Sequence, residues 1–347
     1  DDEQIEQIYA ATLEVLKRTG VMFPHPRAKE IFHSAGASVD GDRVRFSDGM
    51  VEDAIRNTPS RIVLGKRGGE PSVVLEGDRF WFGASLDLLD YLDPLTDERR
   101  PFNTDDCRIT ATVADALPNL DWVMTIGLAA DMPADTADRA IVKQTLTFTE
   151  KPLVFCCKDR NSLQDIYEMA VVVAGSEEAF RQAPAVALYT EPISPLVNYE
   201  PAIDKMIFSA EKGIPLVNSP APTFGGTAPA TFAGAVVQGL AESLSGLVLV
   251  HLVRPGTPYI CGAFTTVMDM STTIFSYGAP EMSLTTAALA QVAQHLRIPF
   301  WGTAGCSDAK RPDPQAAAET AFSCLSSALI GANLIHDTGW IDHGSLV

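Results

Sequence analysis

The hydrophobic positions follow two different patterns, which divide the chain near residue 105. In the first part, apolar residues recur at helical spacing over 3–19 and Gly20 follows, which predicts an amphipathic helix that ends there. A second helix is predicted near 26–35. Short runs of β-branched and aromatic residues, separated by turns that contain glycine, predict strands over 60–68, 71–77 and 79–85. We therefore expect a small α+β subdomain over residues 1–105.

The second part, residues 106–347, repeats a short apolar run followed by a helical segment. Most runs carry apolar residues at both alternating positions, which is typical of strands covered on both faces in a parallel sheet. The runs are 121–127, 152–157, 185–191, 214–220, 258–264, 298–305 and 333–339. Pro229, Pro280 and Pro314 stand where we expect helices to begin, and Asp313 is expected to cap the helix that Pro314 starts.

Seven consecutive strand–helix units predict the α/β class and a (β/α)8 TIM barrel that follows the N-terminal α+β subdomain. A flattened open sheet is the structural alternative. Because seven barrel strands are visible, we expect the eighth to lie beyond Val347 and the C-terminal part of the barrel to be incomplete. The chain begins with Asp1 rather than methionine, so we also expect the natural N-terminus to be missing or processed.

The composition is acidic, with 26 Lys and Arg against 44 Asp and Glu, and a formal net charge of -18. Such a charge argues against nucleic acid partners and anionic membrane surfaces, because both need basic contacts. The longest apolar run, 232–253, is long enough to cross a membrane, but Gln238, Glu242 and His251 interrupt it. We therefore expect a buried helix there, no membrane, and a cytoplasmic protein.

The six cysteines predict neither a disulfide framework nor a metal site. None forms a C-x-x-C pair, and none has the spacing to a histidine that zinc motifs require. Four lie in apolar segments, where a reduced cysteine acts as a small hydrophobic residue. Cys306 has no histidine near it in sequence, which makes it a poor candidate for a nucleophile.

Candidate catalytic residues follow from the rule that the carboxyl ends of barrel strands build the site. Glu191 closes an apolar strand directly before a proline, and we expect its carboxylate to act in the site. Asp308 and Lys310 lie in the charged loop GTAGCSDAKRPDPQ, residues 302–315, and are expected to act with it. The alternatives are a salt bridge at the rim for Glu191, and an exposed ion pair between Asp308 and Lys310 that would contribute little.

Further residues at or near predicted strand ends are expected to bind a substrate. They are Asn218, Phe224, Phe264, Tyr277 and His336. Aromatic faces beside a carboxylate form a receptor for a quaternary ammonium group, which cannot donate a hydrogen bond. The residues therefore predict a site for a small cationic or zwitterionic ligand. Core packing is the alternative for the aromatic residues, and a satisfied core histidine is the alternative for His336.

Several stretches resemble, in the same order, the trimethylamine methyltransferase family, which acts with a corrinoid protein. They are LDPLTDERRPF (92–102), EPISPL (191–196), GIPLVNSPAPTFGGTAPATFAGAVVQGLAE (213–242), VRPGTPYICG (253–262), FTTVMDMSTTIFSYGAPE (264–281), SDAKRPDPQAAAE (307–319) and GANLIHDTGWIDHG (331–344). Two elements are fairly specific, namely G-x-x-x-P-A-T-x-A-G and D-A-K-x-P-D-x-Q. Together the stretches span most of residues 90–344.

This resemblance implies a barrel that moves a methyl group from an amine to Co(I) of a separate corrinoid protein. The corrinoid, or methylcobalamin, would come from that partner, with no cofactor bound directly by this chain. Family members that use trimethylamine carry pyrrolysine, which is absent from this sequence and whose place is expected near the SDAKRPD loop. Members without it resemble enzymes for quaternary amines such as glycine betaine. Family members also continue well beyond the end of this chain.

A quaternary substrate is physically consistent with the missing pyrrolysine. Its nitrogen is already positively charged, so the departing amine is neutral and needs no general acid. The barrel then has to orient the methyl group and exclude water. If the substrate is a betaine, its carboxylate needs a donor, for which His336, Lys310 and Asn218 are candidates.

Three other interpretations stay open from the sequence. One is a lyase or hydrolase for amines on the same barrel, the second is a non-catalytic betaine-binding protein, and the third is a trimethylamine methyltransferase homologue. The apolar share of 46% also leads us to expect a homo-oligomer.

Overall fold

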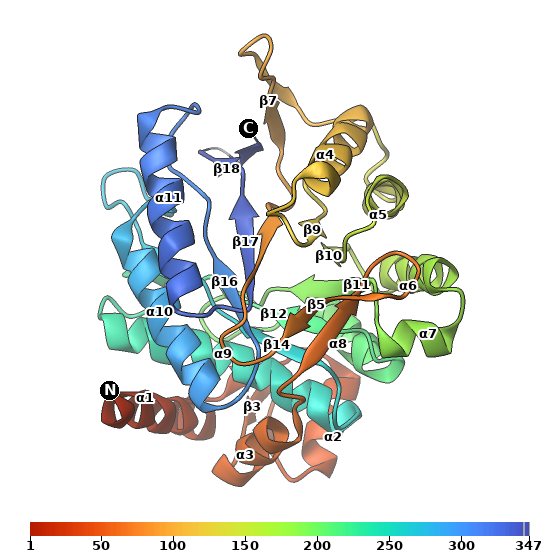
Figure 1. Cartoon of the computed structure of the whole chain (residues 1–347). Helices are drawn as coiled ribbons and strands as arrows, with labels where there is room; N and C mark the ends of the chain where they lie inside the picture. The colour runs from red at the N-terminus through yellow and green to blue at the C-terminus, as the bar shows by residue number, and fades with distance from the viewer. Residues whose placement is uncertain (343, 347) are drawn as a thin grey trace.

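The computed structural model describes residues 1–342 and 344–346, and its centre is an eight-stranded parallel barrel. The strand order is β6-β17-β16-β14-β12-β11-β10-β9, and a bridge from Gly83 to Trp122 closes the ring (Figure 1). The strands are β6 (Trp81–Ala84), β9 (Val123–Met124), β10 (Leu153–Phe155), β11 (Val186–Thr190), β12 (Leu216–Asn218), β14 (Tyr259–Gly262), β16 (Phe300–Thr303) and β17 (Leu334–Thr338). The TIM barrel and all seven strands predicted after residue 105 are confirmed.

The eighth barrel strand is β6, which corrects two predictions. We expected this segment in the N-terminal subdomain and the eighth strand beyond Val347. Instead, β6 pairs in parallel with β17, from Leu334 opposite Trp81 to Thr338 opposite Ala84. The error has a physical reason, because β6 follows two short strands with no helix between them, and its partner lies about 250 residues away. The bridge at Gly83 also excludes the flattened open sheet.

Helices surround the barrel in the order expected from strand–helix units (Figure 1). They are α4 (Thr104–Ala116), α5 (Ala137–Phe148), α6 (Arg160–Ala174), α7 (Glu177–Gln182), α8 (Glu200–Lys212), α9 (Phe232–Val253), α10 (Pro280–His295) and α11 (Pro314–Leu329). Pro280 and Pro314 begin their helices, and the Asp313 carboxylate accepts a hydrogen bond from the Ala316 amide at 3.1 Å. The prediction for Pro229 is wrong, since α9 begins at Phe232 with Thr231 as its N-cap, and Pro229 lies against Gly234 of the first turn.

Helix α9 is the long apolar run of the sequence. It is the one helix in residues 1–342 and 344–346 that is long and apolar enough to cross a membrane, but 89% of that stretch is buried inside the protein. It packs against α1, α3, α8 and β14. The prediction of a buried helix is confirmed.

The N-terminal region packs beneath α9. It contains α1 (Asp2–Glu14), the π-helix η1 (Val15–Thr19), α2 (Pro26–Ser34), α3 (Asp48–Asn57) and a small antiparallel sheet of β1 (Val21–Met22), β3 (Arg43–Arg45) and β2 (Ser38–Asp40). The first helix ends at Gly20, which has φ 69° and where a Cβ would lie 2.2 Å from the Val44 carbonyl oxygen. Glycine is therefore required at that stop.

A hairpin seals one end of the barrel. Strands β4 (Ile62–Gly65) and β5 (Pro71–Leu75) pair in antiparallel fashion, and the Gly65 amide donates to the Pro184 carbonyl just before β11. Apolar side chains of the hairpin form one buried cluster with residues inside the barrel, including Ile62, Leu64, Val73, Leu75, Trp122, Val154, Trp301 and Leu334. The amino-terminal end of the barrel is thus an apolar plug.

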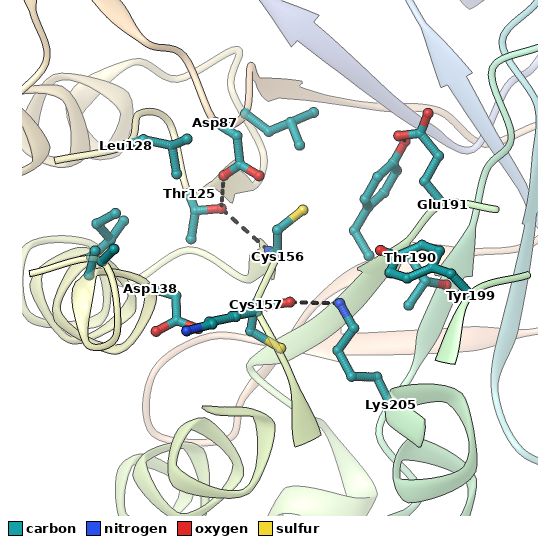
Figure 2. Close-up of a pocket in the computed structure, with 16 residues that line it drawn as sticks. Asp87, Thr125, Leu128, Asp138, Cys156, Cys157, Thr190, Glu191, Tyr199 and Lys205 are labelled. Atoms are coloured by element: carbon teal, nitrogen blue, oxygen red, sulfur yellow. Dashed lines mark hydrogen bonds between the residues drawn. The ribbon is translucent and has the colours of Figure 1, made fainter. Parts of the chain in front are cut away.

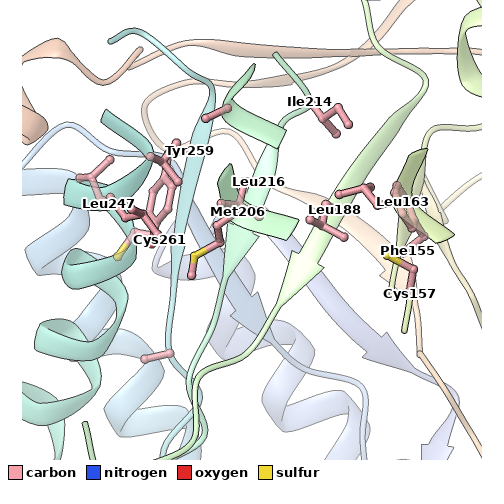
Figure 3. Packing of buried hydrophobic residues seen from close by; sticks show 14 of the residues in the cluster. Phe155, Cys157, Leu163, Leu188, Met206, Ile214, Leu216, Leu247, Tyr259 and Cys261 are labelled. Atoms are coloured by element: carbon pink, nitrogen blue, oxygen red, sulfur yellow. The ribbon is translucent and has the colours of Figure 1, made fainter. Parts of the chain in front are cut away.

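A second core lies between the strands and the outer helices. Figure 3 shows Phe155, Leu188 and Leu216 of the strands beside Leu163 and Met206 of the helices. At the opposite end from the hairpin, a small sheet of β18 (Trp340–Ile341), β19 (Ser345–Leu346), β7 (Asp90–Leu92) and β8 (Arg99–Pro101) stands above the carboxyl ends of the strands (Figure 1). Two further short strands, β13 (Thr223–Phe224) and β15 (Thr266–Val267), pair at the same end.

Candidate active site

A cavity of about 540 Å³ opens at the carboxyl ends of β6, β9, β10 and β11 (Figure 2). Its wall consists of Leu86, Asp87, Thr125, Leu128, Ala134, Ala137, Asp138, Ile141, Cys156, Cys157, Lys158, Tyr189, Thr190, Glu191, Tyr199 and Lys205. A second cavity of about 500 Å³ shares Glu191 and Tyr199 with it. The volume and mixed lining are typical of a site for a small molecule.

Glu191 follows the last residue of β11 and faces both cavities. The Tyr189 hydroxyl lies 3.4 Å from its Oε2 and 3.3 Å from the Ser219 carbonyl oxygen, to either of which it can donate. Burial raises the pKa of Glu191 to about 7, the tyrosine hydrogen bond opposes the rise, and the nearby carboxylates of Glu242, Asp337 and Asp87 add to it. A cation in the cavity would favour the ionised form.

The loop after Glu191 is fixed by a buried carboxylate of α9. Glu242 accepts hydrogen bonds from the Ser194 hydroxyl at 2.6 Å, the Leu196 amide at 2.8 Å and the Gln238 side chain at 2.9 Å. These contacts hold residues 192–199 against the outer helix. Glu242 thereby positions Glu191 and Tyr199 without lining the larger cavity.

Asp87 supplies a second carboxylate, from the loop that follows β6. The Thr125 hydroxyl donates to it at 3.1 Å and accepts from the Cys156 amide at 3.5 Å. Burial raises the pKa of Asp87, against hydrogen bonds from Cys156 and Thr125 that lower it. Burial also raises the pKa of the Cys156 thiol well above its usual value, and the charge of Asp87 adds to this effect. Cys156 therefore stays a thiol at neutral pH.

Aromatic rings extend from the barrel interior to its mouth. Trp301 lies between Tyr189 and His336, with ring centroids 5.5 Å and 4.5 Å apart. The series continues through contacts of 6.0, 5.8, 4.8 and 3.9 Å that join His336, Phe264, Phe275, Tyr277 and Trp340 in turn. The indole N–H of Trp301 is buried without a hydrogen-bond partner among the described residues.

His336 is engaged at both ring nitrogens. Its Nδ1 lies 2.8 Å from the Gly302 carbonyl oxygen and its Nε2 lies 3.2 Å from Asp337 Oδ2. Asp337, at φ 85°, also accepts from the Ser85 hydroxyl at 3.2 Å, and burial raises its pKa. Both ring nitrogens of His336 thus have contacts within the protein, and His336 does not line the cavity.

Asp308 and Lys310 do not pair with each other. Asp308 accepts the backbone amides of Tyr277 and Gly278, both at 2.9 Å, so it clamps the loop that carries Tyr277. Burial raises the pKa of Asp308. Lys310 is 72% exposed and its ammonium group lies 2.5 Å from Asp342. The alternative of an exposed ion pair between the two residues is wrong.

Asn218 and Phe224 also lie outside the larger cavity. Asn218 is fully buried, accepts from the Thr190 hydroxyl at 3.2 Å and donates to the Ser243 carbonyl at 3.5 Å. Phe224 packs against Phe232 with ring centroids 6.3 Å apart. Of the eight residues predicted for the site, Glu191 is the one that lines this cavity, and the roles of the others stay predictions.

Besides Glu191, the wall contains four charged residues that the sequence did not assign to the site, namely Asp87, Asp138, Lys158 and Lys205. Asp87 was missed because β6 was assigned to the N-terminal subdomain. Lys205 was missed because lysines are common on helices, although Ala202, Met206 and Ser209 place it on a fully apolar or buried stripe of α8. A lysine on such a stripe was the available signal.

Comparisons with known proteins agree with this architecture. The family model described as trimethylamine methyltransferase (MTTB) matches residues 1–347. The chain is 32% identical to a trimethylamine methyltransferase MttB of Desulfitobacterium hafniense, over 99% of this chain and 70% of that protein. It is 32% identical to MttB of Methanosarcina thermophila, over 99% and 72%. It is 26% identical to a glycine betaine methyltransferase of Desulfitobacterium hafniense, over 98% and 71%.

Among solved structures, the chain is similar to the monomethylamine methyltransferase MtmB of Methanosarcina barkeri. The TM-score is 0.67 with 11% sequence identity, over 100% of this chain and 70% of that one. Since the identity is low, this likeness shows the shared barrel fold alone.

Proposed function

The chain belongs to the trimethylamine methyltransferase family and is a methyltransferase, and from that premise we propose its substrate and acceptor. In this proposal it transfers an N-methyl group from a quaternary amine, glycine betaine or a related betaine, to Co(I) of a separate corrinoid protein. The observation that carries the proposal is Glu191, a carboxylate on the cavity wall beside Tyr189 and Tyr199. A quaternary ammonium group is recognised by such a combination of charge and aromatic faces.

The residues of the cavity suit a transfer that moves no proton. The leaving group is a neutral tertiary amine, so the step needs no general acid at the nitrogen. A Co(I) corrinoid, when the partner presents it, supplies the nucleophile. The chain itself would orient one methyl group toward the open mouth and keep water away from the ammonium group.

A covalent methyl-cysteine intermediate is disfavoured by the state of the thiols. Burial raises the pKa of Cys157 to about 12, and it also raises the pKa of Cys156 and Cys306 well above the usual value. A thiol is a much weaker nucleophile than a thiolate. The methyl group would therefore pass directly to the external acceptor.

Glu191 is proposed to act in binding more than in the chemical step. The positive charge on nitrogen disappears as the C–N bond breaks, so a fixed carboxylate stabilises bound substrate more than the transition state. An interaction of that kind lowers KM without raising kcat. The aromatic wall has the same effect, because it also recognises the cation.

The loops around the mouth fit the approach of a corrinoid protein. Large apolar side chains are exposed in the loops that follow four barrel strands, namely Leu89, Leu128, Ile193, Met270 and Ile274. Exposed apolar residues that gather at one end of a protein are typical of an interaction surface. Both ring nitrogens of His336 already contact Gly302 and Asp337, so we do not expect His336 to ligate the cobalt. The corrinoid protein would supply the cobalt ligands itself.

The test is anaerobic absorbance of cob(I)alamin mixed with the protein and one amine at a time. Glycine betaine, proline betaine, carnitine, choline and trimethylamine are the amines to compare. Loss of the Co(I) band and gain of methyl-Co(III) with a betaine is the expected result. No conversion with any amine, with free cob(I)alamin and with corrinoid proteins alike, would contradict the proposal.

The second candidate is methyl transfer from trimethylamine. It is favoured by the higher identity to the two MttB proteins, 32% against 26% for the glycine betaine methyltransferase. Conversion with trimethylamine and with none of the quaternary amines would establish it in the same assay.

A further inference from the structure

Lys205 is a buried lysine whose ammonium group lacks a carboxylate partner at ion-pair distance in residues 1–342 and 344–346. Its side chain is 4% exposed, and its Nζ donates to the Cys157 carbonyl oxygen at 2.6 Å. An ammonium group has three N–H donors, so two remain for another partner. Since a buried charge without a counter-ion in direct contact is costly, the position favours an anionic group that binds from the cavity.

The ammonium group lies on the wall of the same cavity as the carboxylates of Asp87, Asp138 and Glu191. Figure 2 shows it below Cys156, with Asp87 above and Glu191 to the upper right. Its charge acts to lower the pKa of Asp87, although burial is the larger influence and raises that pKa. The cavity of about 540 Å³ therefore holds a buried cation together with carboxylates, of which Asp138 already accepts the amides of Arg139 and Lys158.

Resting on the proposed function, we infer that Lys205 binds the carboxylate of the substrate while Glu191 and Asp87 face its quaternary ammonium group. Lys205 is thus the residue that makes the site specific for a zwitterion, a betaine, over a methylated cation that lacks a carboxylate. The bond would be a charge-assisted hydrogen bond from a buried side chain.

Other basic groups near the mouth are already occupied. Lys158 lines the same cavity but is exposed and pairs with Asp135. Lys310 pairs with Asp342. The ring nitrogens of His336 contact Gly302 and Asp337. Lys205 is the cation of this set that lines the cavity without a carboxylate at ion-pair distance.

The test is calorimetric binding of glycine betaine and of its methyl ester to the wild-type protein and to Lys205→Met. The ester keeps the quaternary ammonium group and loses the carboxylate charge. Wild-type protein should prefer betaine by about 10- to 100-fold, as expected for one charge-assisted hydrogen bond. Lys205→Met should lose that preference, with ester binding unchanged or improved because a like charge is gone. Lys205→Arg should restore part of the preference.

Lys212→Met is the matched control, because Lys212 lies on the same helix and contacts the rings of Tyr167 and Phe208 away from the cavity. It should keep the wild-type preference. If Lys205→Met does not fold, wild-type protein decides alone, because equal affinity for betaine and ester overturns the inference. Equal losses for both ligands in Lys205→Met also overturn it.

These measurements contain no corrinoid, which separates the two claims. A Lys205-dependent preference for betaine over its ester, without methyl transfer to Co(I), would contradict the proposed function and support the binding role of Lys205. Methyl transfer from betaine, with a betaine preference that does not depend on Lys205, would contradict the role of Lys205 and leave the proposed function standing.

Discussion

The two ends of the barrel differ in the side chains that the same eight strands bring together. At the amino-terminal end, Leu64 and Val73 of the hairpin close the barrel with apolar side chains against Trp122 and Leu334. At the carboxyl end, Asp87, Glu191 and Asp337 are carboxylates whose burial raises their pKa. The first arrangement contributes stability through buried apolar area. The second costs stability, because charges are desolvated there.

This difference indicates where substitutions should change the stability of the fold and where they should change ligand binding. The hairpin residues of the plug do not line the cavity, whereas Tyr189 belongs both to the plug cluster and to the cavity wall. Residues of the mouth are held by specific hydrogen bonds and retain capacity for an outside partner. Variants of the two ends should therefore separate stability from binding.

The largest expected effect is at the plug. Leu64 is fully buried, so Leu64→Ala should lower the free energy of unfolding by about 2–5 kcal/mol. Betaine affinity of the folded fraction should stay within about twofold, since additivity holds for distant sites. Denaturant unfolding and calorimetry check the two halves of this prediction. Leu95→Ala, at a position 93% exposed, is the matched control and should change neither.

The opposite pattern is expected for Glu191→Gln. Loss of the carboxylate should raise the KM for betaine about 30- to 100-fold, with a smaller change in kcat, because one charge-assisted contact to the cation is removed. Stability at pH 8 should not fall, since a desolvated charge is removed as well. Glu200→Gln, an exposed change nearby on α8, is the control. A loss confined to kcat would contradict the binding role.

The pH dependence sharpens the comparison further. With the pKa of Glu191 near 7, the carboxylate ionises as pH rises through 7, and betaine affinity should increase about tenfold between pH 6 and pH 8. The folded protein keeps a proton between about pH 4.5 and 7 that the unfolded chain releases, so this group's contribution to stability falls as pH rises through that window. Both dependences should flatten in Glu191→Gln. An affinity that falls with pH would contradict the assignment.

The smallest effect is expected for Asp308→Asn. The Asn side-chain oxygen can accept a hydrogen bond from one of the backbone amides of Tyr277 and Gly278, but the NH2 group repels the other amide. The loss of one hydrogen bond should lower the stability of this loop conformation by about 1 kcal/mol. The KM should rise a few-fold, with kcat retained. A loss of activity as large as that of Glu191→Gln would instead make Asp308 part of the catalytic group.

The sequence predicted the parts of this molecule that are encoded locally. Strands covered on both faces, the Asp313 cap and the Gly20 stop each depend on neighbouring residues, and Glu191 was found because it ends an apolar strand. The closure of the barrel was not predictable, since β6 pairs with a strand at the other end of the chain. Asp87 lies in the loop after β6, so its place on the cavity wall was not predicted either.

The contacts of Asp308 and Lys310 were not predictable either, for a similar reason. The two residues were predicted to act in the site, and an exposed ion pair between them, two residues apart, was the alternative. The fold gives each a distant partner, the amides of 277–278 for Asp308 and Asp342 for Lys310. Lys205 meets Glu191 and Asp87 on one cavity wall through the barrel geometry alone.

The most direct test of the central claim, that the mouth holds a bipolar cavity for a betaine, is a crystal structure of the protein with glycine betaine bound. The account predicts the trimethylammonium group beside Glu191 and Tyr199 and the carboxylate within hydrogen-bond distance of Lys205 Nζ. A betaine bound with its carboxylate at His336 or Lys310, or outside this cavity, would contradict it.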